Sequence, residues 1–256
     1  MRTDVFGRSH RGLQLAGLIG SIWLLSLAFA LSLDLSRTSP LLTTILVLLR
    51  AFLHTGLFIV AHDAMHGSLA PGRSAANRII GTLCLILYAG LCFQCCLRNH
   101  SLHHHAAETS DDPDFRSQPE QSVISWYWQF LNNYLNTRQI VTLASIWLVY
   151  YKLAGFTNPQ PVTNLLVFCV LPLILSSLQL FIIGTWLPHN DNASESGTNG
   201  PKSLRLHPVL SFAACYHFGY HSEHHGSPST PWFLLPQQQH SMPHASCKTE
   251  LLGAPS

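Results

Sequence analysis

Long apolar stretches recur along this 256-residue chain and predict helices that cross a membrane. A helix needs about 20 apolar residues to span the hydrocarbon core of a bilayer. Four stretches approach or reach that length, namely Leu13–Leu33, Leu41–Ala61, Arg138–Gly155 and Asn164–Leu187. The pattern therefore predicts an all-α integral membrane helical bundle of about four transmembrane helices, with further helices at the interface.

The chain reads as one membrane-embedded domain with polar ends. We expect this domain at residues 13–236, after a short N-terminal segment at 1–12. Residues 237–256 are polar and show no periodicity, so we expect a flexible C-terminal tail there.

A fifth apolar stretch, Ile79–Leu97, is as apolar as the others but cannot be a simple span. His62 follows the second span and His100 follows this stretch. If the stretch crossed the bilayer, these two histidines would emerge on opposite faces. We therefore expect it to lie along the interface or to dip into it, which leaves four spans and both termini on one side.

The charged residues agree with this topology. Only 10% of the residues are charged, against roughly 25% in a typical soluble protein. Eleven of the 14 lysines and arginines fall on one side, since Arg37 and Lys152 lie opposite and Arg50 lies inside the second span. Cytoplasmic loops carry such an excess, so we expect the termini and the histidines near them on the cytoplasmic side.

The small net charge of +2 argues against a nucleic-acid binder.

Three histidine boxes carry the candidate chemistry. The first is HxxxH, and the second and third are both HxxHH; their histidines are His62 and His66, then His100, His103 and His104, then His221, His224 and His225. On a helix, residues at i, i+3 and i+4 share a face. Each box therefore directs two or three imidazoles the same way, at the end of an apolar segment.

The number of histidines argues for more than one metal ion. A tetrahedral zinc ion takes about four ligands, so eight imidazoles exceed the need of one ion and suit two ions of higher coordination number. Imidazole binds iron, zinc, copper and nickel alike. The ligand type therefore leaves the metal open.

Several segments together resemble a known family. They are HDAMHG at 62–67, HxxHH at 100–104, DPDF at 112–115, GTWLPH at 184–189 and YHFGYHSEHH at 216–225. In these segments the chain is similar to the beta-carotene 4-ketolases of the membrane fatty-acid hydroxylase/desaturase superfamily. The resemblance runs from about Phe52 to Pro236.

The resemblance implies a function, cofactors and ligands. It implies an O2-dependent non-haem di-iron oxygenase, fed by a ferredoxin-like electron donor, that introduces a keto group at C4 of a carotenoid ring. Two hydroxylations and loss of water would convert beta-carotene to echinenone and canthaxanthin, or zeaxanthin to astaxanthin. The eight box histidines would bind two iron ions, with His189 as a ninth ligand and His217, one turn before His221, as a tenth candidate. Where relatives continue the second box with HxHPG, this chain has His105-Ala106-Ala107-Glu108.

Carboxylates near the boxes are candidates for orienting the ligands. Asp112 and Asp114 follow the second box, and Asp63 and Glu223 lie inside the other two. A carboxylate that accepts the free N–H of a ligating imidazole fixes the orientation of its ring. For Arg50 and His54, inside the second span, we expect structural pairing with polar groups.

Other functions remain open from the residues alone. A carotenoid 3-hydroxylase, a fatty-acid hydroxylase or a desaturase could use the same boxes. A metal transporter is a candidate of a different class, although transporters bind their ions near the bilayer midplane and these histidines lie at helix ends. An intramembrane zinc protease is disfavoured, because HDAMH lacks the glutamate of HExxH.

Overall fold

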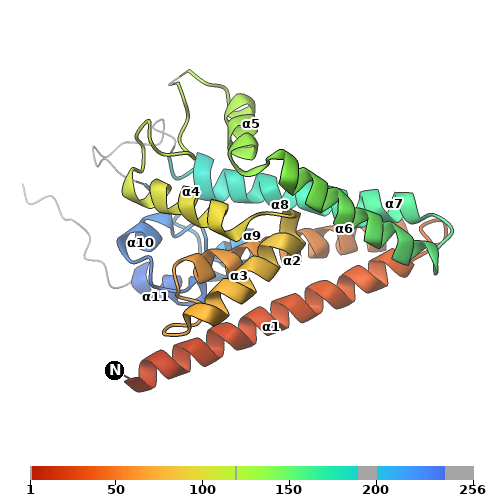
Figure 1. Cartoon of the computed structure of the whole chain (residues 1–256), viewed down its shortest axis with the longest axis horizontal. Helices are drawn as coiled ribbons and strands as arrows, with labels where there is room; N and C mark the ends of the chain where they lie inside the picture. The colour runs from red at the N-terminus through yellow and green to blue at the C-terminus, as the bar shows by residue number, and fades with distance from the viewer. Residues whose placement is uncertain (1, 119, 190–200, 240–256) are drawn as a thin grey trace, which may run out of the picture.

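The computed structural model describes residues 2–118, 120–189 and 201–239, and these residues form helices and no strands (Figure 1). The C-terminal tail expected at 237–256 lies for the most part outside the described residues. The helices are α1 Arg2–Ser32, α2 Pro40–Met65, α3 Ser74–Ala89, α4 Phe93–His105, α5 Val123–Tyr134, α6 Thr137–Gly155, α7 Pro161–Leu165, α8 Leu171–Phe181, α9 Pro208–Cys215, α10 His221–Gly226 and α11 Leu235–Gln239. Two π-helical turns, η1 Leu166–Val170 and η2 Ile182–Trp186, join and follow α8, and a 3-10 turn, η4 Trp232–Leu234, precedes α11.

Within the described residues, three helices are long and apolar enough to cross a membrane. They are Phe6–Ser32 within α1, the whole of α2, and the continuous helix Pro161–Trp186. They coincide with three of the four predicted spans. The remaining prediction, Arg138–Gly155, corresponds to α6, which packs against α1, α3 and α7. It is less apolar than the other three, because both of its ends carry basic residues.

The apolar stretch Ile79–Leu97 turns back on itself, as the parity argument predicts. It forms α3 and α4, which are bent by 98°. Gly90 ends α3 with a φ of +66°, a backbone conformation that glycine adopts without strain. A Cβ at Gly90 would also lie 2.8 Å from the carbonyl oxygen of Gln139. The turn returns α4 to the end of the bundle from which α3 begins (Figure 1), and the rings of His62 and His100 lie 4.5 Å apart.

Helix α2 occupies the centre of the bundle, between α1, α3 and α8. Its buried Arg50 donates hydrogen bonds to the carbonyl oxygens of Trp23 at 2.8 Å and Phe168 at 3.3 Å. His54, one turn later, lies 2.6 Å from the carbonyl oxygen of Tyr88 and accepts a bond from the Trp23 indole. The predicted structural role of Arg50 and His54 is confirmed, because these bonds join α2 to α1, α3 and η1.

Helix α1 runs without a break from Arg2 to Ser32, so the segment expected at 1–12 continues into the helix of the first span. Its outward face is apolar, with Leu25 70% exposed. Such faces suit contact with lipid, because a membrane-spanning helix needs no polar surface towards the hydrocarbon.

Candidate metal centre

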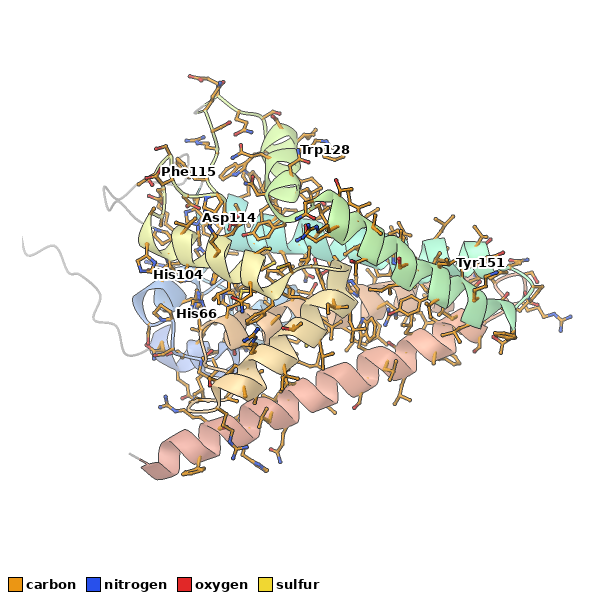
Figure 2. All side chains as sticks on the ribbon, in the orientation of Figure 1. His66, His104, Asp114, Phe115, Trp128 and Tyr151 are labelled. Carbon is orange, nitrogen blue, oxygen red and sulfur yellow. The ribbon has the colours of Figure 1, made fainter. Side chains whose placement is uncertain are left out.

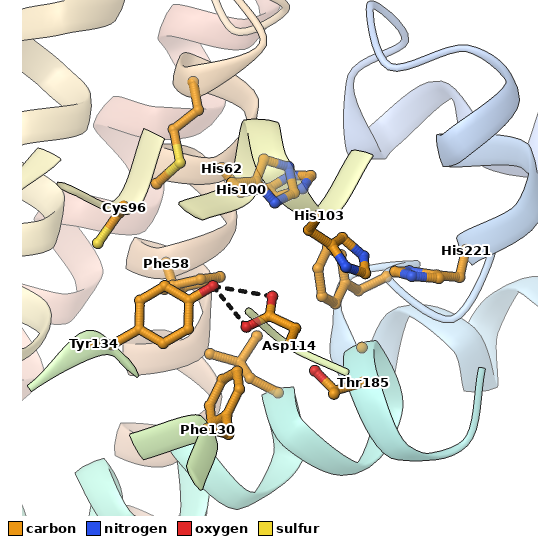
Figure 3. A pocket seen from close by; sticks show the side chains of 14 residues that line it. Phe58, His62, Cys96, His100, His103, Asp114, Phe130, Tyr134, Thr185 and His221 are labelled. Atoms are coloured by element: carbon orange, nitrogen blue, oxygen red, sulfur yellow. Dashed lines mark hydrogen bonds between the residues drawn. The ribbon is translucent and has the colours of Figure 1, made fainter. Parts of the chain in front are cut away.

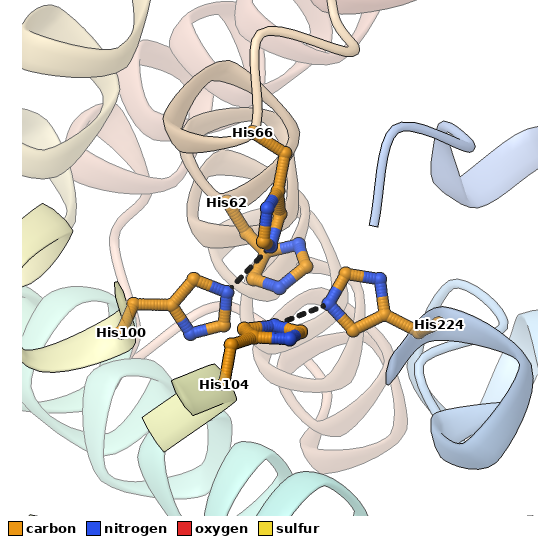
Figure 4. A group of neighbouring side chains, drawn as sticks. All are labelled: His62, His66, His100, His104 and His224. Carbon is orange, nitrogen blue, oxygen red and sulfur yellow. Dashed lines mark hydrogen bonds between the residues drawn. The ribbon is translucent and has the colours of Figure 1, made fainter. Parts of the chain in front are cut away.

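Nine histidines converge in two adjoining clusters at one end of the bundle. In each cluster the candidate ligand atoms lie within 4.8 Å of one another. The five-histidine cluster (Figure 4) consists of His62, His66, His100, His104 and His224. The four-histidine cluster consists of His103, His189, His221 and His225. The clusters meet where the rings of His104 and His225 stack at 4.2 Å.

The spacing of the boxes explains this division. On α4, His100 and His104 are four residues apart and enter the five-histidine cluster, whereas His103 enters the other. On α10, His221 and His225 are four apart and enter the four-histidine cluster, whereas His224 faces the first. Each HxxHH box therefore contributes to both clusters, because an i, i+4 pair lies nearly in line along a helix and the third histidine is rotated away.

The Nε2 atoms of these rings face one another. Nε2 of His66 lies 2.6 Å from Nε2 of His100, and the pair His104 and His224 is separated by 3.0 Å (Figure 4). In the four-histidine cluster, Nε2 of His225 lies 3.1 Å from Nε2 of both His103 and His221. Converging Nε2 atoms are what a metal ion bound among imidazoles requires.

The protonation state of the cluster histidines and one unpaired imidazole nitrogen are also consistent with a bound metal ion. Burial, with the charge of neighbouring histidines, holds the pKa of His224 well below its usual range and lowers the pKa of His225 to about 2. Both imidazoles are therefore neutral at pH 7 and keep a lone pair for a cation. Nε2 of His62 is buried and has no hydrogen-bond partner within the described part of the chain.

Two carboxylates accept hydrogen bonds from the second nitrogen of cluster histidines. Nδ1 of His103 lies 3.0 Å from both carboxylate oxygens of Asp112. Nδ1 of His189 lies 3.3 Å from Oε1 of Glu108. Both contacts leave the Nε2 atom for the cluster. Burial raises the pKa of Asp112, but the hydrogen bond and charge of His103, together with the backbone N–H groups of Asp114 and Glu108, outweigh burial and hold that pKa below its usual range.

Asp114, two residues after Asp112, is hydrogen-bonded to a tyrosine and not to a cluster histidine. Its carboxylate oxygens each accept from the Tyr134 hydroxyl at 2.9 Å (Figure 3). Burial raises the pKa of Asp114 to about 6, against the opposing charge of His103. His103, Asp112 and Asp114 also lie close enough to hold an ion together, but Asp112 already occupies Nδ1 of His103. The two aspartates therefore have different partners.

Helix α5 holds the DPDF segment in place. Its side chains of Trp126 and Gln129 donate to the carbonyl oxygens of Asp114 and Phe115, each at 2.8 Å. Asn133 donates in the same way to the carbonyl of Pro113. The loop after the second histidine box is thus fixed by a helix that follows it in the chain.

His217 lies outside both clusters, contrary to the expectation that it shares a helical face with His221. Helix α9 ends at Cys215, α10 begins only at His221, and Tyr216 and His217 have φ values of +48° and +64°. Because the helix is interrupted between Cys215 and His221, helical spacing does not apply. The His217 ring stacks on Tyr220 instead, at 5.7 Å.

Asp63 and Glu223 hold the chain around the third box. Oδ2 of Asp63 accepts from the backbone N–H of Trp232 at 3.0 Å, and Glu223 accepts from the hydroxyl of Ser203. Nδ1 of His62 lies 3.7 Å from Asp63, beyond hydrogen-bonding distance. Asp63 therefore accepts from a backbone N–H and Glu223 from a serine hydroxyl, and among the described residues neither is hydrogen-bonded to a cluster ring.

Two further residues contribute to the site: Glu108, which the sequence places in the acidic segment after the second box, and Tyr134, which no sequence pattern indicated. Glu108 lies four residues after the second box and has a φ of +64°, a left-handed conformation that residues other than glycine adopt infrequently. Tyr134 is 20 residues from Asp114, so no local spacing could have linked the two.

Two neighbouring cavities lie near the histidines, and the inner one is lined by them. The inner cavity, of about 40 Å³, is lined by residues of both clusters together with Asp114 and Thr185 (Figure 3). The outer cavity, of about 170 Å³, lies among α3, α5, α6 and α8 and is lined almost wholly by apolar and aromatic side chains. Both are lined by Phe58, Phe130, Tyr134 and Leu180. These shared walls place an apolar cavity directly beside the cavity that the cluster histidines line.

Comparison with known proteins identifies the family. The fatty acid desaturase family matches residues 38–141 and 127–249. The chain is 38% identical to a beta-carotene ketolase of Paracoccus sp. (strain PC1), over 84% of this chain and 86% of that protein. It is 39% identical to a beta-carotene ketolase of Paracoccus sp. (strain N81106 / MBIC 01143), over 86% and 89%, and 35% identical to a zeaxanthin 4-ketolase of Chlamydomonas reinhardtii, over 84% and 48%. No solved structure matches the chain. The chain therefore belongs to the fatty acid desaturase family, and within it to the beta-carotene ketolases.

Proposed function

We propose that this protein is a beta-carotene 4-ketolase, which introduces a keto group at C4 of the beta-ionone ring. The observation that carries the proposal is the pair of histidine clusters, which line a small cavity that shares walls with a larger apolar cavity. Together with the ketolase relatives, this arrangement supports oxidation of a large apolar molecule that is delivered from the bilayer.

The metal centre would hold two iron ions. The five-histidine cluster would bind one and the four-histidine cluster the other, with Asp112 and Glu108 orienting His103 and His189. Bound iron would supply the activation of O2 that attack on an allylic C–H bond requires. Electrons would come from an external ferredoxin-like donor.

The protein's own contribution is positioning. The outer cavity would take up the ring, and the inner cavity has room for about three water-sized groups. Only the edge of a ring fits such a space, so the carbon that reaches the histidines is selected by shape. Holding that carbon close to the oxidant decides which bond reacts. Two oxygenations at C4 followed by loss of water would give the ketone.

The same end of the bundle would face the cytoplasm. Figure 2 places His66 and His104 at one end and Tyr151 at the other, and α1 starts at the histidine end (Figure 1). The lysine and arginine excess predicted for that side supports a cytoplasmic site under the positive-inside rule.

Product analysis tests this function. The full chain is produced in beta-carotene-forming bacterial cells, which are grown with ¹⁸O-labelled O2, and the pigments are examined by mass spectrometry while iron is quantified in the purified protein. We expect 4-keto products that carry the label, with iron in the protein. Exclusively 3-hydroxylated or desaturated products would favour the other members of this family, and metal uptake with no oxygenated pigment would favour a transporter.

A further inference from the structure

Asp114 and Tyr134 form a polar pair at the junction of the two cavities (Figure 3). Among the described residues that line the inner cavity, Asp114 is the one carboxylate, and it is 8% exposed. Its neighbours in that wall include Phe58, Phe130 and Leu180. Burying a carboxylate among apolar side chains costs free energy unless a hydrogen bond or an opposite charge compensates for it.

The hydrogen bonds that Asp114 makes within the described residues leave acceptor positions on its carboxylate unused. The two oxygens of an ionised carboxylate offer about four acceptor positions, and the Tyr134 hydroxyl donates at 2.9 Å to each oxygen. The hydrogen bond from Nδ1 of His103 goes to Asp112 instead. Asp114 can therefore accept a further hydrogen bond from a group that enters the inner cavity.

The proposed reaction creates such a group. The first oxygenation at C4 converts an apolar ring edge into an alcohol, whose O–H is a donor inside a cavity with apolar walls. We infer that Asp114, oriented by Tyr134, accepts a hydrogen bond from the C4 hydroxyl of the half-oxidised carotenoid and holds it for the second oxygenation. This inference rests on the proposed function and adds the residues that retain its intermediate.

The pair would distinguish a ketolase from a hydroxylase. A protein that only hydroxylates must release its alcohol, whereas a ketolase must act on the same carbon again. A hydrogen bond from O–H to Asp114 limits rotation of the ring and keeps the remaining C4–H directed at the histidine clusters. No bond is made or broken by Asp114 in this role. Its effect is confined to the second oxygenation, because beta-carotene itself has no hydroxyl group to offer.

Initial rates on two substrates test the inference. Membranes that contain the full chain are supplied separately with beta-carotene and with 4-hydroxy-beta-carotene, and the rate on the alcohol is divided by the rate on beta-carotene. This ratio does not depend on how much active protein a preparation holds. We compare Asp114→Asn and Tyr134→Phe with two matched controls, Asp111→Asn in the same loop and Tyr151→Phe on α6. Asp111 is exposed, and neither control residue lines the two cavities.

We expect Asp114→Asn to lower the ratio about tenfold, because asparagine offers the alcohol only a neutral acceptor and a hydrogen bond to a charged acceptor is stronger. Tyr134→Phe should lower it by a smaller factor, and both controls should keep the wild-type ratio. An unchanged ratio in Asp114→Asn overturns the inference, even if both rates fall together. If that variant does not accumulate, the ratio in Tyr134→Phe decides in the same way. Wild-type protein that oxidises neither substrate at C4 overturns the proposed function, and the inference with it.

Discussion

Nδ1 of His103 lies 3.0 Å from both carboxylate oxygens of Asp112, while Nε2 of the same ring faces His225 at 3.1 Å. The carboxylate therefore fixes the orientation of this imidazole, because its Nδ1–H points at Asp112 and its Nε2 is left to the cluster, where a bound metal would use the lone pair. Asp112 is itself held by the backbone N–H groups of Glu108 and Asp114, at 3.2 and 2.9 Å. One ring of the four-histidine cluster is thus oriented by the loop that follows its own helix.

Replacing Asp112 with asparagine should weaken the metal centre without emptying it. Asparagine keeps the size of the side chain but loses the charge that orients the N–H of His103. Carboxylates in this position typically contribute about 10- to 100-fold to metal affinity or activity, and we expect a loss in that range. Iron content after dialysis against a graded series of chelator concentrations measures it.

Asp111→Asn is the matched control for this measurement, because Asp111 is the exposed neighbour of Asp112 and its side chain contacts neither cluster. The chelator conditions are chosen so that a ligand variant such as His103→Ala loses its iron. If Asp112→Asn then retains as much iron as wild type, the hydrogen bond between Asp112 and His103 does not support metal binding.

The sequence predicts the parts of this site that follow from local spacing. The boxes at 62–66, 100–104 and 221–225 name eight of the nine clustered histidines, because i, i+3 and i+4 positions share a face whenever the segment is helical. Parity places His62 and His100 at the same end without any knowledge of the bend between α3 and α4. His189 came from the family resemblance and not from spacing.

What the sequence could not predict depends on contacts between distant segments. The prediction that His217 shares a helical face with His221 required an unbroken helix, and two residues with positive φ, Tyr216 and His217, interrupt it. The pairing of Asp114 with Tyr134 depends on how α5 packs on the DPDF loop, a tertiary contact that no periodicity encodes. The third predicted span is helical and packs against α1, α3 and α7, but it is not among the helices that are apolar enough to cross a membrane by themselves.

Substitutions at His189 and His217 should have opposite outcomes. His189 lies in the four-histidine cluster with Nε2 at 3.1 Å from Nε2 of His221, whereas His217 stacks on Tyr220 outside both clusters. We expect His189→Ala to lose iron and to lower ketolase activity at least about tenfold. His217→Phe should retain iron, since a phenyl ring preserves the stacking. Loss of iron from His217→Phe with normal protein levels would return His217 to the list of ligands.

Adding one methyl group at Gly184 should disturb the inner cavity. A Cβ there would lie 2.2 Å from a ring carbon of Phe218, and the Phe218 ring contacts His62 at 4.9 Å. Overpacking of this kind costs about 1–3 kcal/mol, so Gly184→Ala should lower the melting temperature in detergent by several degrees and reduce turnover.

Gly17→Ala is the control for the glycine substitution. Gly17 lies in α1 with nothing within 4 Å of the added Cβ, and alanine is favoured over glycine in a helix by about 1 kcal/mol. Its melting temperature should equal or exceed that of wild type. Equal melting temperatures and turnover for Gly184→Ala and wild type would mean that Phe218 moves aside freely.

The buried carboxylate of Asp114 should cost the metal-free protein stability at neutral pH. Its pKa is raised by burial to about 6, above the unfolded value of about 3.9. Between these values the folded state binds more protons than the unfolded state, so stability falls as the pH rises through this window. A difference of about two pKa units corresponds to at most about 3 kcal/mol.

Asp114→Asn removes this penalty, since asparagine carries no charge and can still accept from the Tyr134 hydroxyl. We expect the metal-free variant to melt at a higher temperature than metal-free wild type at pH 8, with a difference that shrinks towards pH 5. The same variant is expected to be slow on the C4 alcohol. It would therefore be more stable than wild type but less active in the second oxygenation, a trade-off typical of functional polar groups in apolar sites. Thermal melts of both proteins at several pH values measure the effect, and a difference that grows on acidification would contradict the assigned direction.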